Sequence, residues 1–206
     1  MADVKGDLSV KNKFDVRNNA RFFKGVDVPY FEAIDQKDPG ILGGASVAGT
    51  FVARDLTLLI QNDFATSVSL TGTAGSGADF TLPPGEYYIE ASAPAFNCGS
   101  HMARLADVTD ESGTRAPTVI QGTVEYTPNV GLTPPSGDES IQTRSQVTGR
   151  FSVARDTRFE IQTAVEVADA SEGFGAGASF TGGDFYHIAF YNVYTIVKIW
   201  QIRDDS

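Results

Sequence analysis

Apolar and polar side chains alternate with a period of two along much of the chain, as in strands with one buried and one solvated face. The segment 86–92 shows this most clearly, directly after a turn at Leu82–Gly85. One face carries Tyr87, Ile89 and Ala91, and the other carries Tyr88, Glu90 and Ser92. The first set is expected in a core and the second in solvent.

Two further segments alternate in the same way on either side of the turn Ala154–Thr157. Their inward positions are Val147, Phe151, Val153, Phe159, Ile161, Val165 and Val167, and their outward positions are Arg150, Ser152, Arg158, Glu160, Gln162 and Glu166. Other candidate strands are 50–61, 67–70, 79–82, 101–108, 118–127 and the segment from Asp184 onward. About eight to ten short strands separated by turn residues, with no helical period and no repeat, predict an all-β sandwich of the jelly-roll type.

The stretch NVYTIVKIWQI, residues 192–202, is apolar on both faces. A regular strand would place Val193, Val197 and Ile199 on one side and Tyr194, Ile196 and Trp200 on the other. Leaving such a side chain in water forfeits about 1.5 to 3 kcal/mol, so something is expected to cover the second face. We favour further copies of the chain in a closed ring over the internal loop 173–183. The candidate interface residues are Tyr194, Ile196, Lys198 and Trp200.

A run of glycine and proline between residues 39 and 49 predicts a boundary at about residue 48. We therefore expect an N-terminal segment, 1–48, and a β domain, 49–206. The segment carries Phe22, Phe23, Tyr30 and Phe31 but is too short for a core of its own. It is either a disordered tail or, as we favour, an anchor that becomes ordered on a larger assembly.

Composition narrows the remaining options. The chain has 206 residues, 41% of them hydrophobic, which is enough for one core and an appendage. No apolar run approaches the roughly 20 residues that cross a bilayer, and the charged N-terminus predicts no signal peptide. Cys98 has no second cysteine to pair with, so a small buried residue is expected.

The net charge of −10 is unevenly distributed. Residues 1–48 hold seven basic and seven acidic side chains, whereas 49–206 hold nine and nineteen, with Lys198 as the only lysine. Such a surface repels phosphate, so neither nucleic acid nor an anionic membrane is an expected partner.

Catalytic, metal and cofactor sites are not expected. The two histidines, His101 and His187, are more easily explained as structural residues than as catalytic bases. One cysteine and two histidines cannot supply a zinc site. The acidic turn 107–111 leaves calcium open, but it lacks the spacing of a calcium loop. Glutamates on outward strand faces indicate solvated charge, so a glycosidase pair has no support.

Several ordered blocks resemble a known group. They are FTLPPGEYYIEASAPAF, HMARLADVTD, QGTVEY, QTRSQVTGRFSV, RFEIQ, EGFG and VYTIVKIWQI. From about residue 49 onward the chain resembles the C1q/TNF-like jelly-roll domains of tailed-phage virion surface proteins. This resemblance implies a homotrimer on the surface of a virion, as a tail-fibre, head-fibre or capsid-decoration component.

The role implied by the resemblance is host attachment by binding of cell-surface carbohydrate. Residues 1–48 would then dock onto other virion proteins, with Phe22, Phe23, Tyr30 and Phe31 as the candidate contacts. The alternative is a decoration or cement protein that stabilises the head without a receptor. A polysaccharide depolymerase is a third, disfavoured interpretation.

Two segments depart from the family pattern, a longer loop at 127–140 and an insertion at 181–192. Exposed loops with aromatic side chains commonly carry binding specificity. The candidate ligand contacts are Phe185, Tyr186, His187 and Tyr191, although the insertion could equally be a packing ridge.

Overall fold

The computed structural model describes residues 28–64, 66–70, 77–110, 115–128, 141–177 and 191–203, and its regular structure is β. The strands are β1 (Tyr30–Lys37), β2 (Val52–Ala53), β3 (Leu58–Asn62), β4 (Val68–Ser69), β5 (Asp79–Leu82), β6 (Gly85–Phe96), β7 (Gly99–Asp107), β8 (Thr118–Thr127), β9 (Gln142–Val153), β10 (Thr157–Val165) and β11 (Asn192–Arg203). Within these ranges, no helix is long and apolar enough to cross a membrane.

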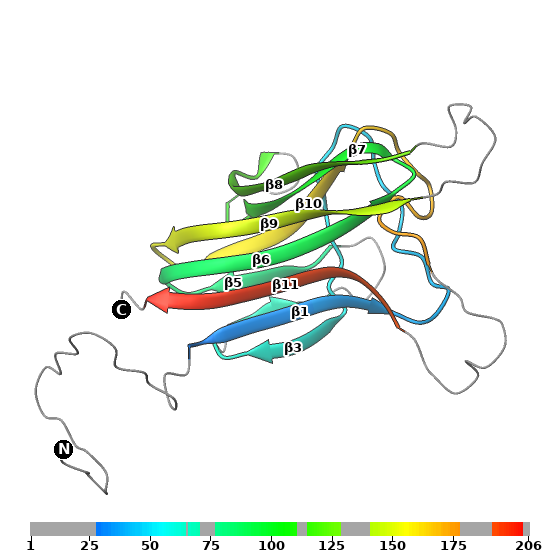
Figure 1. Cartoon of the computed structure of the whole chain (residues 1–206). Coiled ribbons are helices and arrows are strands. Elements are labelled where there is room, and N and C mark those ends of the chain that lie inside the picture. The colour runs from blue at the N-terminus through cyan, green and yellow to red at the C-terminus, as the bar shows by residue number, and fades with distance from the viewer. Residues whose placement is uncertain are drawn as a thin grey trace, which may run out of the picture.

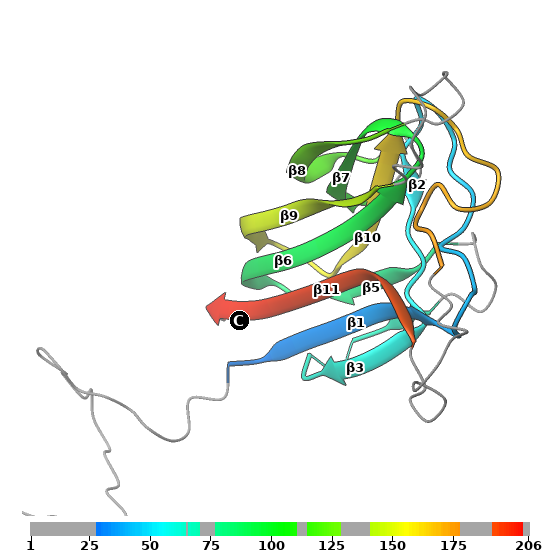
Figure 2. The same cartoon turned by 45° about the vertical axis from the view of Figure 1, so that its right-hand side comes forward.

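The strands form two antiparallel sheets that pack face to face (Figures 1 and 2). Sheet A has the order β3-β1-β11-β6-β9, and sheet B has the order β4-β5-β10-β7-β8, with β2 added to β10. Apart from the short β2, β3 and β4, the first strand pairs with the last, β5 with β10, β6 with β9 and β7 with β8. This nested pairing is that of a jelly roll, so the predicted all-β jelly-roll sandwich is confirmed.

The predicted boundary at residue 48 falls inside the sandwich. β1 lies between β3 and β11 in sheet A, and Phe31 and Ala33 are buried in the core. The sequence of β1 does not show the apolar alternation of a core strand, because two of its inward positions are Asp35 and Lys37, which are also buried. The predicted strand 50–61 is likewise two strands, β2 in sheet B and β3 in sheet A.

Aromatic rings link the two sheets through the core. Phe31 stacks on Phe80 at 5.0 Å between ring centroids, and Phe80 lies 6.1 Å from Phe159. Phe159 contacts Phe151, and Phe151 stacks on Tyr87, both at 5.6 Å. The inward positions predicted for β6 and β9 are therefore confirmed, and Cys98 is buried as expected.

One predicted outward position, Gln162, is fully buried. Its side-chain oxygen accepts hydrogen bonds from Arg104 Nε at 2.9 Å and Nη2 at 2.6 Å. The ring of Phe51, next to β2, lies 3.8 Å from the guanidinium carbon of Arg104. The segment before β2 therefore covers this part of the outer face of sheet B.

The sandwich is closed along the side where β8 meets β9. Ser145 Oγ donates to Thr123 O at 2.6 Å, and the amide of Gln146 donates to Thr123 Oγ1 at 3.0 Å. The close approach requires a glycine, because a Cβ at Gly122 would lie 2.6 Å from Gln146 O and 2.8 Å from Ala103 O. These bonds between the sheets satisfy part of the free edge of β8.

Four charged side chains are buried at the end of the sandwich where β1 ends and β11 begins. Lys37 Nζ lies 3.4 Å from Asp35 Oδ2 and 3.3 Å from Asp55 Oδ2, and it donates to Gly43 O at 3.1 Å. Neither carboxylate oxygen of Asp35 accepts a hydrogen bond from a described residue. Burial raises the pKa of Asp35 to about 6, against the lowering effect of Lys37 and Arg54.

Arg54 is the fourth member of this cluster. It donates from Nε to Thr195 Oγ1 at 3.0 Å and from Nη2 to Phe174 O at 2.8 Å, and its guanidinium carbon lies 4.1 Å from the centroid of the Phe174 ring. Burial lowers its pKa to about 10, so the guanidinium remains charged at neutral pH. The hydrogen bonds of the cluster therefore connect the chain near residues 43 and 174 to the start of β11.

We predict that Gly122→Ala destabilises the protein by about 1 to 3 kcal/mol, because the added methyl group must push β8 and β9 apart. Urea unfolding measures the loss. The neighbouring change Gln121→Ala, at an exposed position of the same strand, is the control and should change stability by less than about 0.5 kcal/mol. Equal stability of Gly122→Ala and wild type would contradict the close approach of the sheets.

We predict that Asp35→Asn becomes steadily more stable relative to wild type as the pH rises from about 4 to 7. The pKa of Asp35 is raised above its ordinary value of 3.8, so the stability linked to its protonation is complete below about pH 4 and lost as the pH rises through about 6. Loss of the ion pair with Lys37 shifts the stability of the variant by an amount that does not depend on pH. The test is therefore how the stability difference between the two proteins changes with pH.

Urea unfolding of both proteins at a series of pH values measures this difference. Burial lowers the pKa of His101 to about 4, which acts in the opposite direction, since its stabilising effect is lost as the pH falls. His101 is present in both proteins and cancels. A difference that stays flat from pH 4 to 8 would contradict the raised pKa.

Candidate functional site

The outer face of sheet A is not covered by another element of the described residues. Its inner face packs on sheet B, whereas no described element lies over the outer face in either view (Figures 1 and 2). Residues opposite one another on antiparallel strands point to the same face, so the outer side chains form rows across the sheet.

The rows cross β11. One of the four interface residues predicted on this strand, Tyr194, does not lie on the outer face. Ile34 on β1 pairs with Ile196, but Gln36 pairs with Val193, so β11 has one extra residue between these pairs. This bulge buries both Tyr194 and Thr195 and shifts the alternation. Tyr194 is only 1% exposed and lies inside the sandwich, whereas Val193 points outward.

The other three predicted interface residues, Ile196, Lys198 and Trp200, lie on the outer face as expected. Each is partly exposed, and the residues between them, Val197 and Ile199, are buried in the core. β11 is therefore apolar on both sides, with one side inside the sandwich and the other uncovered.

An aromatic row crosses the face at Trp200. The indole lies between Tyr30 of β1, at 5.2 Å between ring centroids, and Tyr88 of β6, at 5.9 Å. Arg150 of β9 stands opposite Tyr88 and ends the row. Three adjoining rings on one exposed face provide the kind of apolar surface that protein interfaces bury.

An ionic row lies beside the aromatic one. Lys198 is opposite Glu32 on one side and Glu90 on the other, and its Nζ lies 3.7 Å from Glu32 Oε1. Tyr30 donates its hydroxyl hydrogen to Glu32 at 2.8 Å, and Tyr88 donates to Glu90 at 3.2 Å. Partial burial and the bond to Glu32 raise the pKa of Tyr30, so the phenol remains a donor at neutral pH.

An aliphatic row completes the pattern. Ile34 is opposite Ile196 on one side and Leu58 on the other, and Leu58 is 38% exposed. Ile60, also on β3, is 49% exposed. The face thus consists of aromatic, ionic and aliphatic rows, which we call the striped face.

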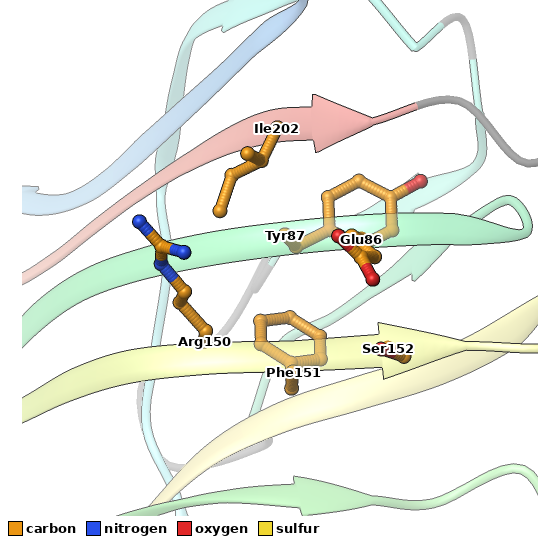
Figure 3. A pocket seen from close by; sticks show the side chains of 6 residues that line it. All are labelled: Glu86, Tyr87, Arg150, Phe151, Ser152 and Ile202. Atoms are coloured by element: carbon orange, nitrogen blue, oxygen red, sulfur yellow. The ribbon is translucent and has the colours of Figure 1, made fainter.

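Two shallow hollows adjoin at the end of the striped face where β11 ends. The larger, about 450 Å³, is lined by Val28, Tyr88, Arg150, Trp200, Gln201 and Ile202. The smaller, about 220 Å³, is lined by Glu86, Tyr87, Arg150, Phe151, Ser152 and Ile202 (Figure 3). Arg150 and Ile202 line both hollows, so the two adjoin, and we call the pair the trough.

The remaining predicted site residues differ in where the structure places them. Phe31, a predicted docking residue, is buried in the core, and Tyr30 lies on the striped face. Tyr191 is 54% exposed, just before β11. Phe22, Phe23, Phe185, Tyr186 and His187 lie outside the described residues.

The described residues offer little for catalysis or metal binding. His101 is 2% exposed, and its Nε2 lies 2.8 Å from Thr143 Oγ1, out of reach of a substrate. Within these residues, no three histidine, cysteine or acidic side chains are grouped to hold a metal ion.

Sequence reasoning missed Tyr30, Tyr88, Glu32 and Glu90 as parts of one surface. The sequence does indicate that Tyr88 and Glu90 point outward, because they lie on a strand with a clear period of two. The sequence does not show that β11 pairs with both β1 and β6. This pairing brings one tyrosine–glutamate pair to each side of Trp200 and Lys198.

Neither a protein-family model nor a curated protein matches the chain. Among solved structures, it is similar to the globular domain of zebrafish complement 1qA protein, with a TM-score of 0.45 and 11% identity over 86% of this chain and 100% of that one. It is also similar to murine APRIL in a crystal structure at pH 5.0, with a TM-score of 0.44 and 8% identity over 85% and 100%. These likenesses concern the fold alone, and by its strand order the chain is a jelly-roll sandwich.

Proposed function

We propose that the protein is a homotrimeric structural protein on the surface of a phage or phage-like particle, where it takes part in recognition of host-surface glycans. The observation that carries the self-assembly is the striped face, which exposes aromatic and aliphatic side chains on β1, β3, β6 and β11. The role on a particle is supported by the sequence blocks that resemble virion jelly-roll domains.

Self-association is the economical cover for this face. Trp200, Ile196, Ile34 and Leu58 would each contribute on the order of 1 kcal/mol or more when buried, since apolar burial is worth about 25 cal/mol per Å². A single small patch would be too weak, but the aromatic and aliphatic rows together extend over the four strands β3, β1, β11 and β6. In a closed ring every copy covers this surface against its neighbours.

Glycan recognition would then depend on avidity. Three weak sites on one rigid head, repeated over a particle, bind far more strongly than any one alone. Tyr191 is the predicted ligand contact that the structure describes, and its exposure keeps it available. The surplus of acidic residues in 49–206 favours an uncharged or cationic ligand over an anionic one.

We predict that Trp200→Ser converts trimers into monomers or aggregates. The change removes the central ring of the aromatic row and leaves the core residues Val197 and Ile199 in place. Sedimentation velocity measures the size. Tyr126→Ser, at a 61% exposed position on β8 in the other sheet, is the control and should remain trimeric. A folded, soluble trimer of Trp200→Ser would refute the striped face as the interface.

The role on the particle has its own test. Full-length protein is applied to an array of bacterial surface glycans and, separately, to particles stripped of it. Specific sugar binding that Tyr191→Ala weakens at least tenfold is expected for attachment. Restored heat resistance of the particles with no sugar binding would instead establish the decoration role.

A further inference from the structure

Arg150 and Glu90 are opposite charges on the striped face that do not pair with each other. Both are exposed, Arg150 on β9 and Glu90 on the adjacent β6. Arg150 stands opposite Tyr88, and Glu90 stands opposite Thr148, so the two charges are diagonal neighbours. Among the ion pairs between described residues, none includes either side chain.

Other arginines of β9, of the β9–β10 turn and of β10 have partners within the chain. Arg144, also on β9, donates to Ser92 Oγ at 3.1 Å and to the carbonyl oxygen of Tyr194. Arg155 forms an ion pair with Asp110 at 2.6 Å, and Arg158 donates to Val108 O at 2.9 Å. Arg150 instead borders the trough, on the opposite side of Phe151 from the carboxylate of Glu86 (Figure 3).

Glu90 is held in place without a cation of its own. Lys198, its neighbour across the strands, lies 3.7 Å from the competing carboxylate of Glu32. The hydroxyl of Tyr88 donates to one carboxylate oxygen of Glu90 at 3.2 Å, and no bond from a described residue to the other oxygen is seen. The ionic row therefore has one carboxylate more than its single lysine can neutralise.

The charge balance of the striped face points to another copy as the source of the missing cation. Among the outward side chains that the structure describes, three are acids, Glu32, Glu86 and Glu90, and three are bases, Lys198, Arg144 and Arg150. The whole chain, in contrast, has a net charge of −10. Copies that meet through this face avoid the repulsion of the remaining surface, and each buried charge can find an opposite charge.

We propose that Arg150 of one copy pairs with Glu90 of the next and that this pair fixes the orientation of neighbouring copies in the ring. The inference rests on the proposed self-assembly through the striped face. In a ring, unlike groups of successive copies meet at each contact, and the structure offers the Arg150 cation on edge strand β9 and the Glu90 carboxylate on the neighbouring β6. The rings of Tyr88 and Trp200 would exclude water around the pair and strengthen it.

The test uses charge reversal in the full-length chain, with size measured by sedimentation velocity and native mass spectrometry. Arg150→Glu and Glu90→Arg alone are each expected to weaken association at least tenfold, since each places two like charges at every contact. The double variant should recover most of the wild-type association. Arg155→Glu, the same charge change on the exposed β9–β10 turn, is the control and should associate as wild type does.

A mixing experiment separates pairing between copies from pairing within one chain. An equimolar mixture of the Arg150→Glu and Glu90→Arg chains should form trimers that contain both chains, because two of the three contacts then join opposite charges. Neither chain should do so alone. If a reversed side chain impairs folding, as judged by thermal unfolding, Arg150→Gln and Glu90→Gln replace the reversals and should weaken association in the same direction.

The outcomes separate the two proposals. A wild-type chain that stays monomeric at micromolar concentration refutes self-assembly and the pairing together. A wild-type trimer with Arg150→Glu equally trimeric refutes the pairing alone. Single variants that dissociate, with neither the double variant nor the mixture recovering, show that both residues matter but not to each other, which also overturns the pairing.

Discussion

The pairing of β1 with β11 is the constraint on which the rest of the molecule depends. It places the first and last described strands side by side within sheet A, so the sheet is complete only when residues more than 150 positions apart meet. The inner side chains of β11, Val197 and Ile199, then join the core. The same pairing assembles the striped face, because Trp200 and Lys198 acquire their neighbours from β1 and β6 only in this arrangement.

The buried charges near the start of β11 restrict this arrangement further. Lys37, Arg54 and Asp55 each have hydrogen-bond partners. Asp35 is fully buried and lies 3.4 Å from Lys37 Nζ, but it accepts no hydrogen bond from the described residues. Burying a carboxylate without such bonds costs folding free energy, so the cluster is not expected to add much net stability. It does specify which segments meet, since the carbonyl oxygens of Gly43 and Phe174 are bound by its two cations.

The uncovered face combines apolar surface with paired and unpaired charges. Its aromatic and aliphatic rows favour removal from water, and its described charged side chains are balanced, although the chain as a whole is strongly acidic. Apolar burial alone would permit many relative orientations of two copies. Charged groups discriminate among orientations, because a misplaced charge remains buried without a partner. The ionic row between two apolar rows is therefore the part of the face suited to set the geometry of an assembly.

The alternation of side chains was sufficient to identify the fold class and the faces of β6 and β9. Tyr87, Ile89, Val147 and Phe151 lie inward as expected, because one side of each strand meets the core and the other meets solvent. The same pattern indicated that Ile196 and Trp200 lie on an apolar face outside the core. These conclusions need only the local period of a strand, which the sequence contains.

Tertiary structure decided the rest. Tyr194 is buried because a bulge in β11 shifts its alternation, and β1 belongs to the sandwich although charged Asp35 and Lys37 interrupt its apolar pattern. Neither follows from local periodicity, since the bulge is defined by the partner strand and the buried charges by groups distant in sequence. The striped face likewise exists only through strand order, which brings Tyr30, Trp200 and Tyr88 together from three separate parts of the chain.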